Sequence, residues 1–225
     1  MIAHAGRLYL RFALSFRDVE ELFAERGVQV SYETFRRWVA KFGALYAEEL
    51  RRRDARCGRT WPLDEMAMRI GGRLHWLWRA VDEHGQTLDV LLQAQRDGGA
   101  AERFFRRLLD VVGGAPPARI TTDQLGSYAL ALTRLPELAA AEHLQVSSAM
   151  RCNNRVEQAH QPTRLREHVM RRFKSNACAQ RFLDAFTRVG NLLRPRRHRL
   201  SAGAYRATLR ERVAAWRPVA GLRAA

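Results

Sequence analysis

Three isolated carboxylates have the residue types and settings from which a chemical site can be built. Asp64 lies in the apolar segment W-P-L-D-E-M, Asp123 ends the segment R-I-T-T-D, and Glu157 lies in a basic stretch, N-N-R-V-E-Q-A-H-Q-P-T-R (153–164). Hard divalent cations prefer carboxylate oxygens, and a metal ion held by acids inside a cationic shell can act on a phosphodiester. Together the three residues predict a divalent-metal site that works on a phosphate backbone.

Two of these acids also have a structural interpretation. Asp123 could cap the helix that follows it, and Glu157 could complete a capping box begun by Asn154. Glu157-x-x-His160 matches half of a carboxylate-bridged di-iron motif, but the second copy that such a site needs is missing. Each acid by itself is better explained by a structural role than by a catalytic one. The three acids together, in a strongly basic chain, favour the metal site.

The alternation of side chains along a strand places Asp64 and its neighbour Glu65 on opposite faces. Asp64 shares a face with Met66 and Met68, whereas Glu65 points to the other face. A carboxylate on an apolar face is costly unless a cation compensates it. We therefore favour Asp64 over Glu65 as the metal ligand.

The composition indicates the kind of partner. The 225 residues carry a formal net charge of +16, which predicts a polyanion, with nucleic acid ahead of an anionic membrane. No apolar run approaches the roughly 20 residues of a membrane span, and we expect no signal peptide. The three cysteines (Cys57, Cys152, Cys178) lack C-x-x-C spacing, which argues against disulfides and zinc. We expect a cytoplasmic, nucleoid-associated protein with no membrane partner.

Residues 15–43 predict two helices joined by a turn. Ser15 with Asp18 resembles a capping box, and Gly27 can end the first helix in the left-handed conformation. Ser31 can cap a second helix that has one apolar face and a polar, cationic outer face. Two helices with such an outer face are typical of the helix-turn-helix, although an ordinary helical hairpin is the alternative. The outer-face cations that we expect to bind DNA are Arg36, Arg37 and Lys41.

The middle of the chain alternates between polar and apolar residues and predicts an α/β sheet. Strands are expected over 61–70, 73–82 and 87–95, followed by a helix over 100–112 and a strand over 119–122. Three antiparallel strands and a helical crossover allow the first and fourth strands to be neighbours. The predicted domains are a helix-turn-helix domain (1–50), an Arg-rich linker (51–60), a catalytic domain (61–200) and a basic C-terminal tail (201–225).

Several motifs make the chain resemble a known family. It is similar to the DDE transposases of bacterial insertion sequences, most closely insertion-sequence family six. The matching stretches are L-S-F-R-D-V-E-E-L (14–22), S-Y-E-T-F-R-R-W (31–38), W-P-L-D-E (61–65), L-W-R-A-V-D (77–82), T-D (122–123), N-N-R-V-E-Q-A-H-Q-P-T-R (153–164) and M-R-R-F-K-S (170–175).

The resemblance implies a ribonuclease-H-like fold, with a mixed five-stranded sheet flanked by helices and preceded by a small helix-turn-helix. It implies that Asp64, Asp123 and Glu157 bind two Mg²⁺ ions, which Mn²⁺ can replace, and that Arg164 contacts DNA phosphate. Members of this family bind their terminal inverted repeats, cleave the ends and join them to target DNA by replicative cointegrate formation. Since two ends are cut in one assembly, the expected partners are double-stranded DNA and at least a second copy of the chain.

One position departs from the family pattern. Gln124 follows Asp123 where members usually carry Lys or Arg. The alternative interpretation is therefore a catalytically inactive transposase remnant or a non-enzymatic DNA-binding regulator. A strand-transfer assay with Mg²⁺ distinguishes the two.

Overall fold

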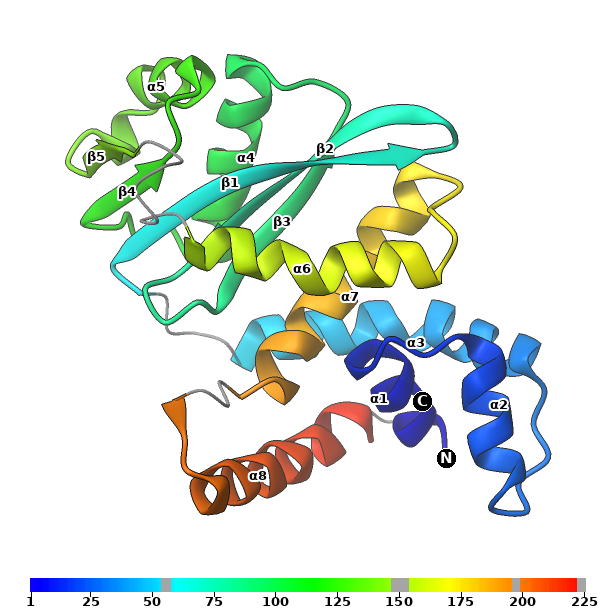
Figure 1. The fold of residues 1–225 in the computed structure, drawn as a ribbon. Coiled ribbons are helices and arrows are strands. Elements are labelled where there is room, and N and C mark those ends of the chain that lie inside the picture. Colours follow the sequence, from blue (N-terminus) through cyan, green and yellow to red (C-terminus); the bar gives the residue numbers. More distant parts are fainter. Residues whose placement is uncertain (54–57, 147–153, 196–198, 222–225) are drawn as a thin grey trace. The chain divides into compact units, whose positions relative to one another are not determined.

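The computed structural model describes residues 1–53, 58–146, 154–195 and 199–221, without the side chains of 154–158 (Figure 1). Two compact units are present, Met1–Arg53 with Arg181–Ala225, and Asp54–Gln180. In chain order the elements are α1 (Ile2–Arg11), α2 (Phe16–Ala24), α3 (Tyr32–Arg53), β1 (Thr60–Ile70), β2 (Arg73–Val81), β3 (Thr87–Gln93), α4 (Gly98–Val111), β4 (Arg119–Thr122), α5 (Gly126–Thr133), the 3₁₀ turn η1 (Pro136–Leu138), β5 (Glu142–Gln145), α6 (Asn154–Val169), α7 (Asn176–Leu193) and α8 (Ala202–Ala220).

The second unit is built on a mixed five-stranded sheet in the order β3-β2-β1-β4-β5. Strands β1, β2 and β3 pair antiparallel, whereas β4 runs parallel to β1 and β5 parallel to β4. Gly71 and Gly72 adopt positive φ angles of 54° and 82° in the tight turn between β1 and β2, as that turn requires. The predicted adjacency of the first and fourth strands and the ribonuclease-H-like fold class are confirmed.

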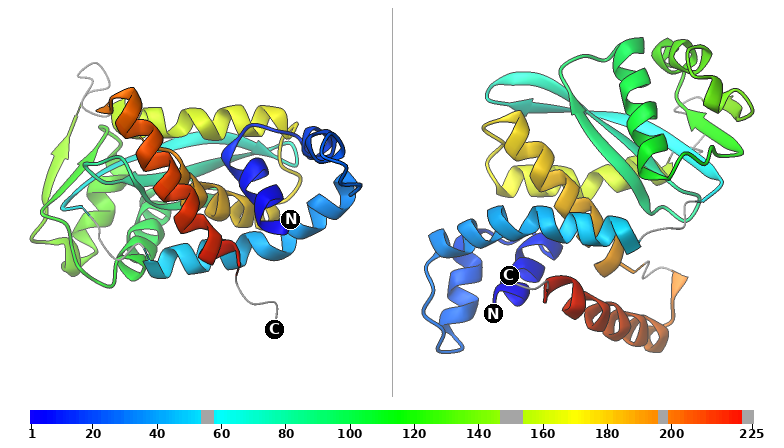
Figure 2. Two further views of the ribbon diagram at one scale, coloured as in Figure 1. Left: turned by 90° about the horizontal axis from the view of Figure 1, so that it is seen from below. Right: turned by 180° about the vertical axis from the view of Figure 1, so that it is seen from behind.

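The two faces of this sheet are covered by different helices. Helices α4 and α5 lie on one face and α6 on the other (Figures 1 and 2). Trp61 and Leu63 of β1 pack with Phe104 and Leu108 of α4 in one buried apolar cluster. Because successive strand residues point to opposite faces, the even-numbered residues of β1 face α6. Strand β1 therefore delivers side chains to both layers.

The first unit is an assembly of helices around a second apolar cluster. Ser15 Oγ accepts a hydrogen bond from the Asp18 amide (3.1 Å), and Asp18 Oδ2 accepts one from the Ser15 amide (2.8 Å), so the predicted capping box begins α2. Gly27 follows α2 with φ 73°. Phe35 of α3 is buried against Phe23 of α2. Helices α2 and α3 are compatible with the predicted helix-turn-helix.

Two boundaries differ from the predicted domains. Helix α3 runs through Arg51–Arg53, which were expected to begin the linker, because Tyr46 and Leu50 continue its buried face. The residues expected to form a basic tail after position 200 form helix α8 instead. Its Trp216 is buried, donates a hydrogen bond from Nε1 to Ala3 O (3.0 Å) and contacts the Tyr46 ring edge-on. Burial of this large aromatic side chain joins the C-terminal helices to the N-terminal ones.

None of the helices in the described part of the chain is long and apolar enough to cross a lipid bilayer.

Candidate functional site

The sheet brings three carboxylates together at the middle of β1, beside the point where β4 ends. Asp64, Glu65 and Asp123 each place one carboxylate oxygen within 4.8 Å of the others. Trp61 pairs with Ile120 in the parallel register of β1 and β4, and Asp123 directly follows β4. Pro62 pairs with Thr121 in the same register, and Asp64 and Asp123 each follow two residues later, so the predicted meeting of these two acids follows from the pairing of β1 with β4. The presence of Glu65 in this cluster was not predicted.

Glu65 is the most deeply buried of the three acids and is held from two sides. Tyr128 Oη of α5 donates a hydrogen bond to Glu65 Oε2 (2.6 Å), and Arg96 binds Glu65 Oε1. Burial raises the pKa of Glu65, and the bonds from Tyr128 and Arg96 act against that shift. Burial also raises the pKa of Tyr128 well above its usual value, so the hydroxyl keeps its proton and donates. Both oxygens of Glu65 are thus engaged by protein groups.

One oxygen of the Asp123 carboxylate stabilises a turn, and the other lies beside Arg96. Asp123 Oδ1 accepts a hydrogen bond from the Leu125 amide (3.0 Å), which shapes the turn before α5; the N-cap of α5 is Leu125 and not Asp123, the cap considered from the sequence. Asp123 Oδ2 lies 3.7 Å from Arg96 Nη2. Gln124, at the position where the family usually has Lys or Arg, is exposed and carries no charge. The cation beside Asp123 is instead Arg96.

Asp64 faces α6, where it meets a buried histidine. His160 Nε2 lies 3.4 Å from Asp64 Oδ2, longer than a well-formed hydrogen bond. Burial lowers the pKa of His160, so the imidazole is neutral near pH 7. Among the described residues neither ring nitrogen has a hydrogen-bond partner. A buried nitrogen with spare bonding capacity beside Asp64 can bind a water molecule or a ligand held there.

Helix α6 carries the other two residues expected at the site. Glu157 lies in its first turn, but the side chain of Glu157 is outside the described residues. Arg164 follows seven positions later, about two helical turns along the same side. Its Nε lies 3.2 Å from Met66 Sδ on β1, and its side chain is exposed. The helix is continuous across Pro162, so that proline does not break the link between Glu157 and Arg164.

Arg79 holds α6 against the sheet beside Asp64. It is the cross-strand partner of Asp64 on β2 and is buried. Its guanidinium donates to Ala159 O and, at 2.7 Å, to Thr163 Oγ1, both on α6. One buried side chain of the sheet therefore ties down the helix that carries Glu157.

The donor set fits a divalent cation. The Asp64 and Asp123 side chains are 20% and 30% exposed, so each can turn an oxygen toward an ion from solvent. Carboxylate oxygens suit hard cations such as Mg²⁺. Glu65 fits this role less well because both of its oxygens are already engaged. The preference for Asp64 over Glu65 as a ligand therefore stays a prediction that the geometry favours.

The three cations expected to bind DNA lie on the outer face of α3. Arg36, Arg37 and Lys41 are exposed. Arg36 forms an ion pair with Glu33 (2.5 Å), one turn earlier on the same helix. Exposed pairs of this kind contribute little to stability, so Arg36 can exchange its partner for a phosphate or a base.

Tyr128→Phe is expected to destabilise the protein by about 1–3 kcal/mol, because it leaves Glu65 Oε2 buried without its donor. The free energy of unfolding in urea measures the loss. Tyr46→Phe is the matched control, since the Tyr46 hydroxyl is buried and has no hydrogen-bond partner in the described part of the chain. A Tyr128→Phe protein as stable as Tyr46→Phe would show that the bond to Glu65 contributes nothing.

Comparisons with known proteins agree on one family. A family profile described as a DDE domain matches residues 58–196. The chain is 32% identical over 167 residues to the transposase for the insertion sequence-like element IS431mec of Staphylococcus aureus, covering 74% of each chain. It is equally similar to the transposase for insertion sequence element IS257 in transposon Tn4003 of Staphylococcus aureus, with the same coverage.

Two solved structures show more distant similarity. A simian T-cell lymphotropic virus intasome in complex with the PP2A regulatory subunit B56 gamma matches with a TM-score of 0.47 and 14% identity, over 63% of this chain and 50% of that one. The HTLV-2 integrase catalytic core domain in complex with magnesium matches with a TM-score of 0.44 and 12% identity, over 66% of this chain and 92% of that one.

Proposed function

The chain belongs to the DDE transposases of insertion-sequence family six, and on that premise we propose that it binds the terminal inverted repeats of its own element and joins the cleaved ends to target DNA by replicative, cointegrate-forming transposition. The membership implies an enzyme that cleaves DNA and transfers strands with divalent metal. The observation that carries the proposal is the meeting of Asp64, in the middle of β1, with Asp123, at the end of the adjacent parallel strand β4.

Asp64, Asp123 and Glu157 form the acidic triad in this proposal and hold two Mg²⁺ ions, which Mn²⁺ can replace. Such ions activate the attacking oxygen and stabilise the leaving oxygen of an in-line displacement. The chain's own residues keep these carboxylates in place. Arg96 places a positive charge beside Asp123, and the neutral His160 offers a hydrogen bond beside Asp64.

Arg164 positions the DNA relative to these acids. Its exposed guanidinium lies on the α6 side of β1, the side that Asp64 also faces. A guanidinium presents paired donors that match a phosphate, so Arg164 can hold the backbone beside the scissile bond. The two ends of an element are processed together, and at least a dimer assembles on DNA in this proposal.

The proposed reaction is tested directly with oligonucleotides that carry the element's terminal repeats. With Mg²⁺ the protein is expected to nick the repeat at its 3′ end and join it to a target plasmid, and with EDTA it is expected only to bind. Binding without joining in Mg²⁺ or Mn²⁺ would instead support the non-enzymatic regulator or inactive remnant.

Replacing Arg36 and Arg37 together by Ala is expected to remove the preference for the cognate repeat while general DNA binding persists. Side chains that reach base edges contribute about 1–3 kcal/mol each to discrimination, so preference should fall at least about tenfold. Competition between the cognate repeat and a scrambled duplex measures this preference. The control replaces Arg52 and Arg53 by Ala at the other end of α3, which removes the same charge and should weaken binding to both duplexes equally. If the Arg36 and Arg37 variant still prefers its repeat, recognition lies on another surface.

A further inference from the structure

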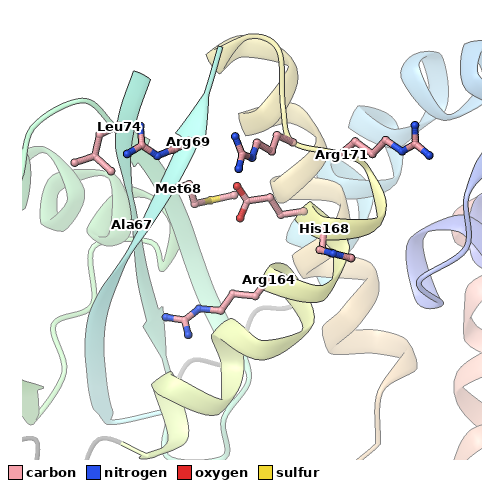
Figure 3. Close-up of a pocket in the computed structure, with 9 residues that line it drawn as sticks. Ala67, Met68, Arg69, Leu74, Arg164, His168 and Arg171 are labelled. Carbon is pink, nitrogen blue, oxygen red and sulfur yellow. The ribbon is translucent and has the colours of Figure 1, made fainter. Parts of the chain in front are cut away.

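A basic pocket lies beside the C-terminal ends of β1 and α6, beyond the acids along β1. It has a volume of about 870 Å³ and lies between the β1–β2 hairpin and the C-terminal end of α6 (Figure 3). Four arginines and one carboxylate line it, so these groups carry three net positive charges. The charged lining residues are Arg69, Arg164, Arg171, Arg172 and Glu167.

The arginines of this pocket are not neutralised by the chain itself. In the described part of the chain none of the four guanidinium groups forms an ion pair. Burial raises the pKa of Glu167, and the nearby Arg172 and Arg164 act against that shift. One partly buried carboxylate cannot offset four cations. The pocket therefore suits an external anion with several charges.

Two of these arginines occupy a backbone conformation that normally selects glycine. Arg171 and Arg172 have φ angles of 52° and 72°, the only positive values at non-glycine residues in the described chain. The Arg171 amide bonds to His168 O and the Arg172 amide to Glu167 O, both at 3.0 Å, which is the Schellman geometry that ends a helix. A non-glycine residue in this region costs about 1–2 kcal/mol. Arginine at both positions indicates that the side chains serve a purpose that glycine cannot.

The segment that presents these arginines is anchored to the sheet. Phe173 is buried and forms a bridge with Ile70, and the Gly71 amide donates to Phe173 O (3.1 Å). Arg171 and Arg172 are therefore held at a fixed place beside the end of β1. A pocket that is already ordered loses little entropy when it binds its ligand.

We propose that this pocket binds backbone phosphates of the DNA substrate at a distance from the scissile phosphate. Arg69 lies five residues beyond Asp64 on β1, about 17 Å in an extended strand. That length corresponds to about five nucleotides of one strand at about 3.4 Å each. Arg164 is the pocket residue that also contacts Met66, two residues after Asp64 on β1, so one DNA strand can run from the acids past Arg164 to Arg171. This inference rests on the proposed function, since it takes the acids as the cleavage site.

The test replaces both Arg171 and Arg172 by Gly and measures binding to the repeat in EDTA at several salt concentrations. Removing two phosphate contacts is expected to reduce the log–log salt slope by about 1.8, at about 0.9 for each phosphate. Because glycine relieves the left-handed strain, the unfolding temperature should stay the same or rise. Weaker binding by a protein that is no less stable separates lost contacts from damaged folding.

A matched control replaces Arg106 and Arg119 by Ala. These exposed residues belong to the same unit, on α4 and β4, and do not line the pocket. If the salt slope changes equally in the two double variants, the effect comes from the loss of positive charge in general and the proposal is wrong. Arg69→Gln, on the strand rather than at the helix end, is expected to reduce the slope by about 0.9 and keeps the test valid if the glycine variant fails to fold.

Single methylphosphonate substitutions in the DNA locate the contact. Substitution about five nucleotides from the cleavage site should weaken binding of the wild-type protein and have no effect on the Arg171 and Arg172 variant. If the methylphosphonate weakens binding of the variant as much as that of the wild-type protein, the pocket does not contact this phosphate. Strand transfer by the wild-type protein would still support the proposed function. If the methylphosphonate weakens binding of the wild-type protein only, but no strand transfer is detected, the pocket binds DNA and the proposed reaction is wrong.

Discussion

Strand transfer is expected to fall by several orders of magnitude when Asp64 or Asp123 is replaced by Asn, or Glu157 by Gln. Each change is nearly isosteric and removes one negative charge from a site whose acids must offset divalent cations. The metal affinity should drop, and the charge that develops on the phosphate in the transition state should lose its stabilisation. Repeat binding in EDTA should stay near the wild-type level, because none of these acids takes part in holding DNA.

The controls for this prediction separate the triad from structural acids. Glu65→Gln should lower stability, since it weakens the ion pair with Arg96 at a buried position. Strand transfer per folded Glu65→Gln molecule should nevertheless survive. If Glu157 were only a helix cap, its replacement would cost about 1 kcal/mol of stability and spare the reaction. A Glu157→Gln protein that joins DNA ends in Mg²⁺ would therefore overturn the triad.

Arg79→Met is expected to lower strand transfer by about 10²-fold or more, beyond its effect on stability. Arg79 bonds to α6 at Ala159 and Thr163, two and six residues beyond Glu157. Without it the helix can shift, and a misplacement of about 1 Å can cost about 10²-fold in rate. Single-turnover joining with saturating DNA, corrected for the folded fraction, measures the change. Arg79→Lys should recover only part of the rate, because an ammonium cannot reproduce the two directed bonds of a guanidinium.

Arg107→Met is the matched control for this positioning role. Arg107 on α4 pairs with the buried Asp89 of β3 at 2.6 Å, on the other side of the sheet from α6. Its loss should destabilise the protein because a buried carboxylate loses an ion-pair partner. The joining rate per folded molecule should remain near the wild-type value. Equal loss of that rate in both variants would show that Arg79 acts through general stability alone.

The sequence determined the local geometry of the chain and allowed its first and fourth strands to be neighbours. Capping and turn geometry depend on residues only a few positions apart, and so the Ser15–Asp18 box and the Gly71–Gly72 turn could be predicted. The pairing of β1 with β4 could be anticipated because a helical crossover, here α4, can carry the chain from β3 across the sheet to the free side of β1. That adjacency was enough to bring Asp64 and Asp123 together.

Only the tertiary structure decided which side chains surround those acids. Glu65 was set aside because it shares no face with Asp64, yet Arg96 and Tyr128 come to it from 31 and 63 residues away. No local pattern encodes such partners, because they meet only when α5 and the segment before α4 pack on the sheet.

The C-terminal residues illustrate the same limit. Their basic composition suggested a tail, but burial of Trp216 against Tyr46 makes them part of the helical unit. The left-handed Arg171 and Arg172 were equally invisible in the sequence, since glycine is the usual signal for that conformation. The bridge between Phe173 and β1 holds these residues in a conformation that their local preference disfavours. Contacts between residues distant in sequence can outweigh a local conformational cost of about 1–2 kcal/mol.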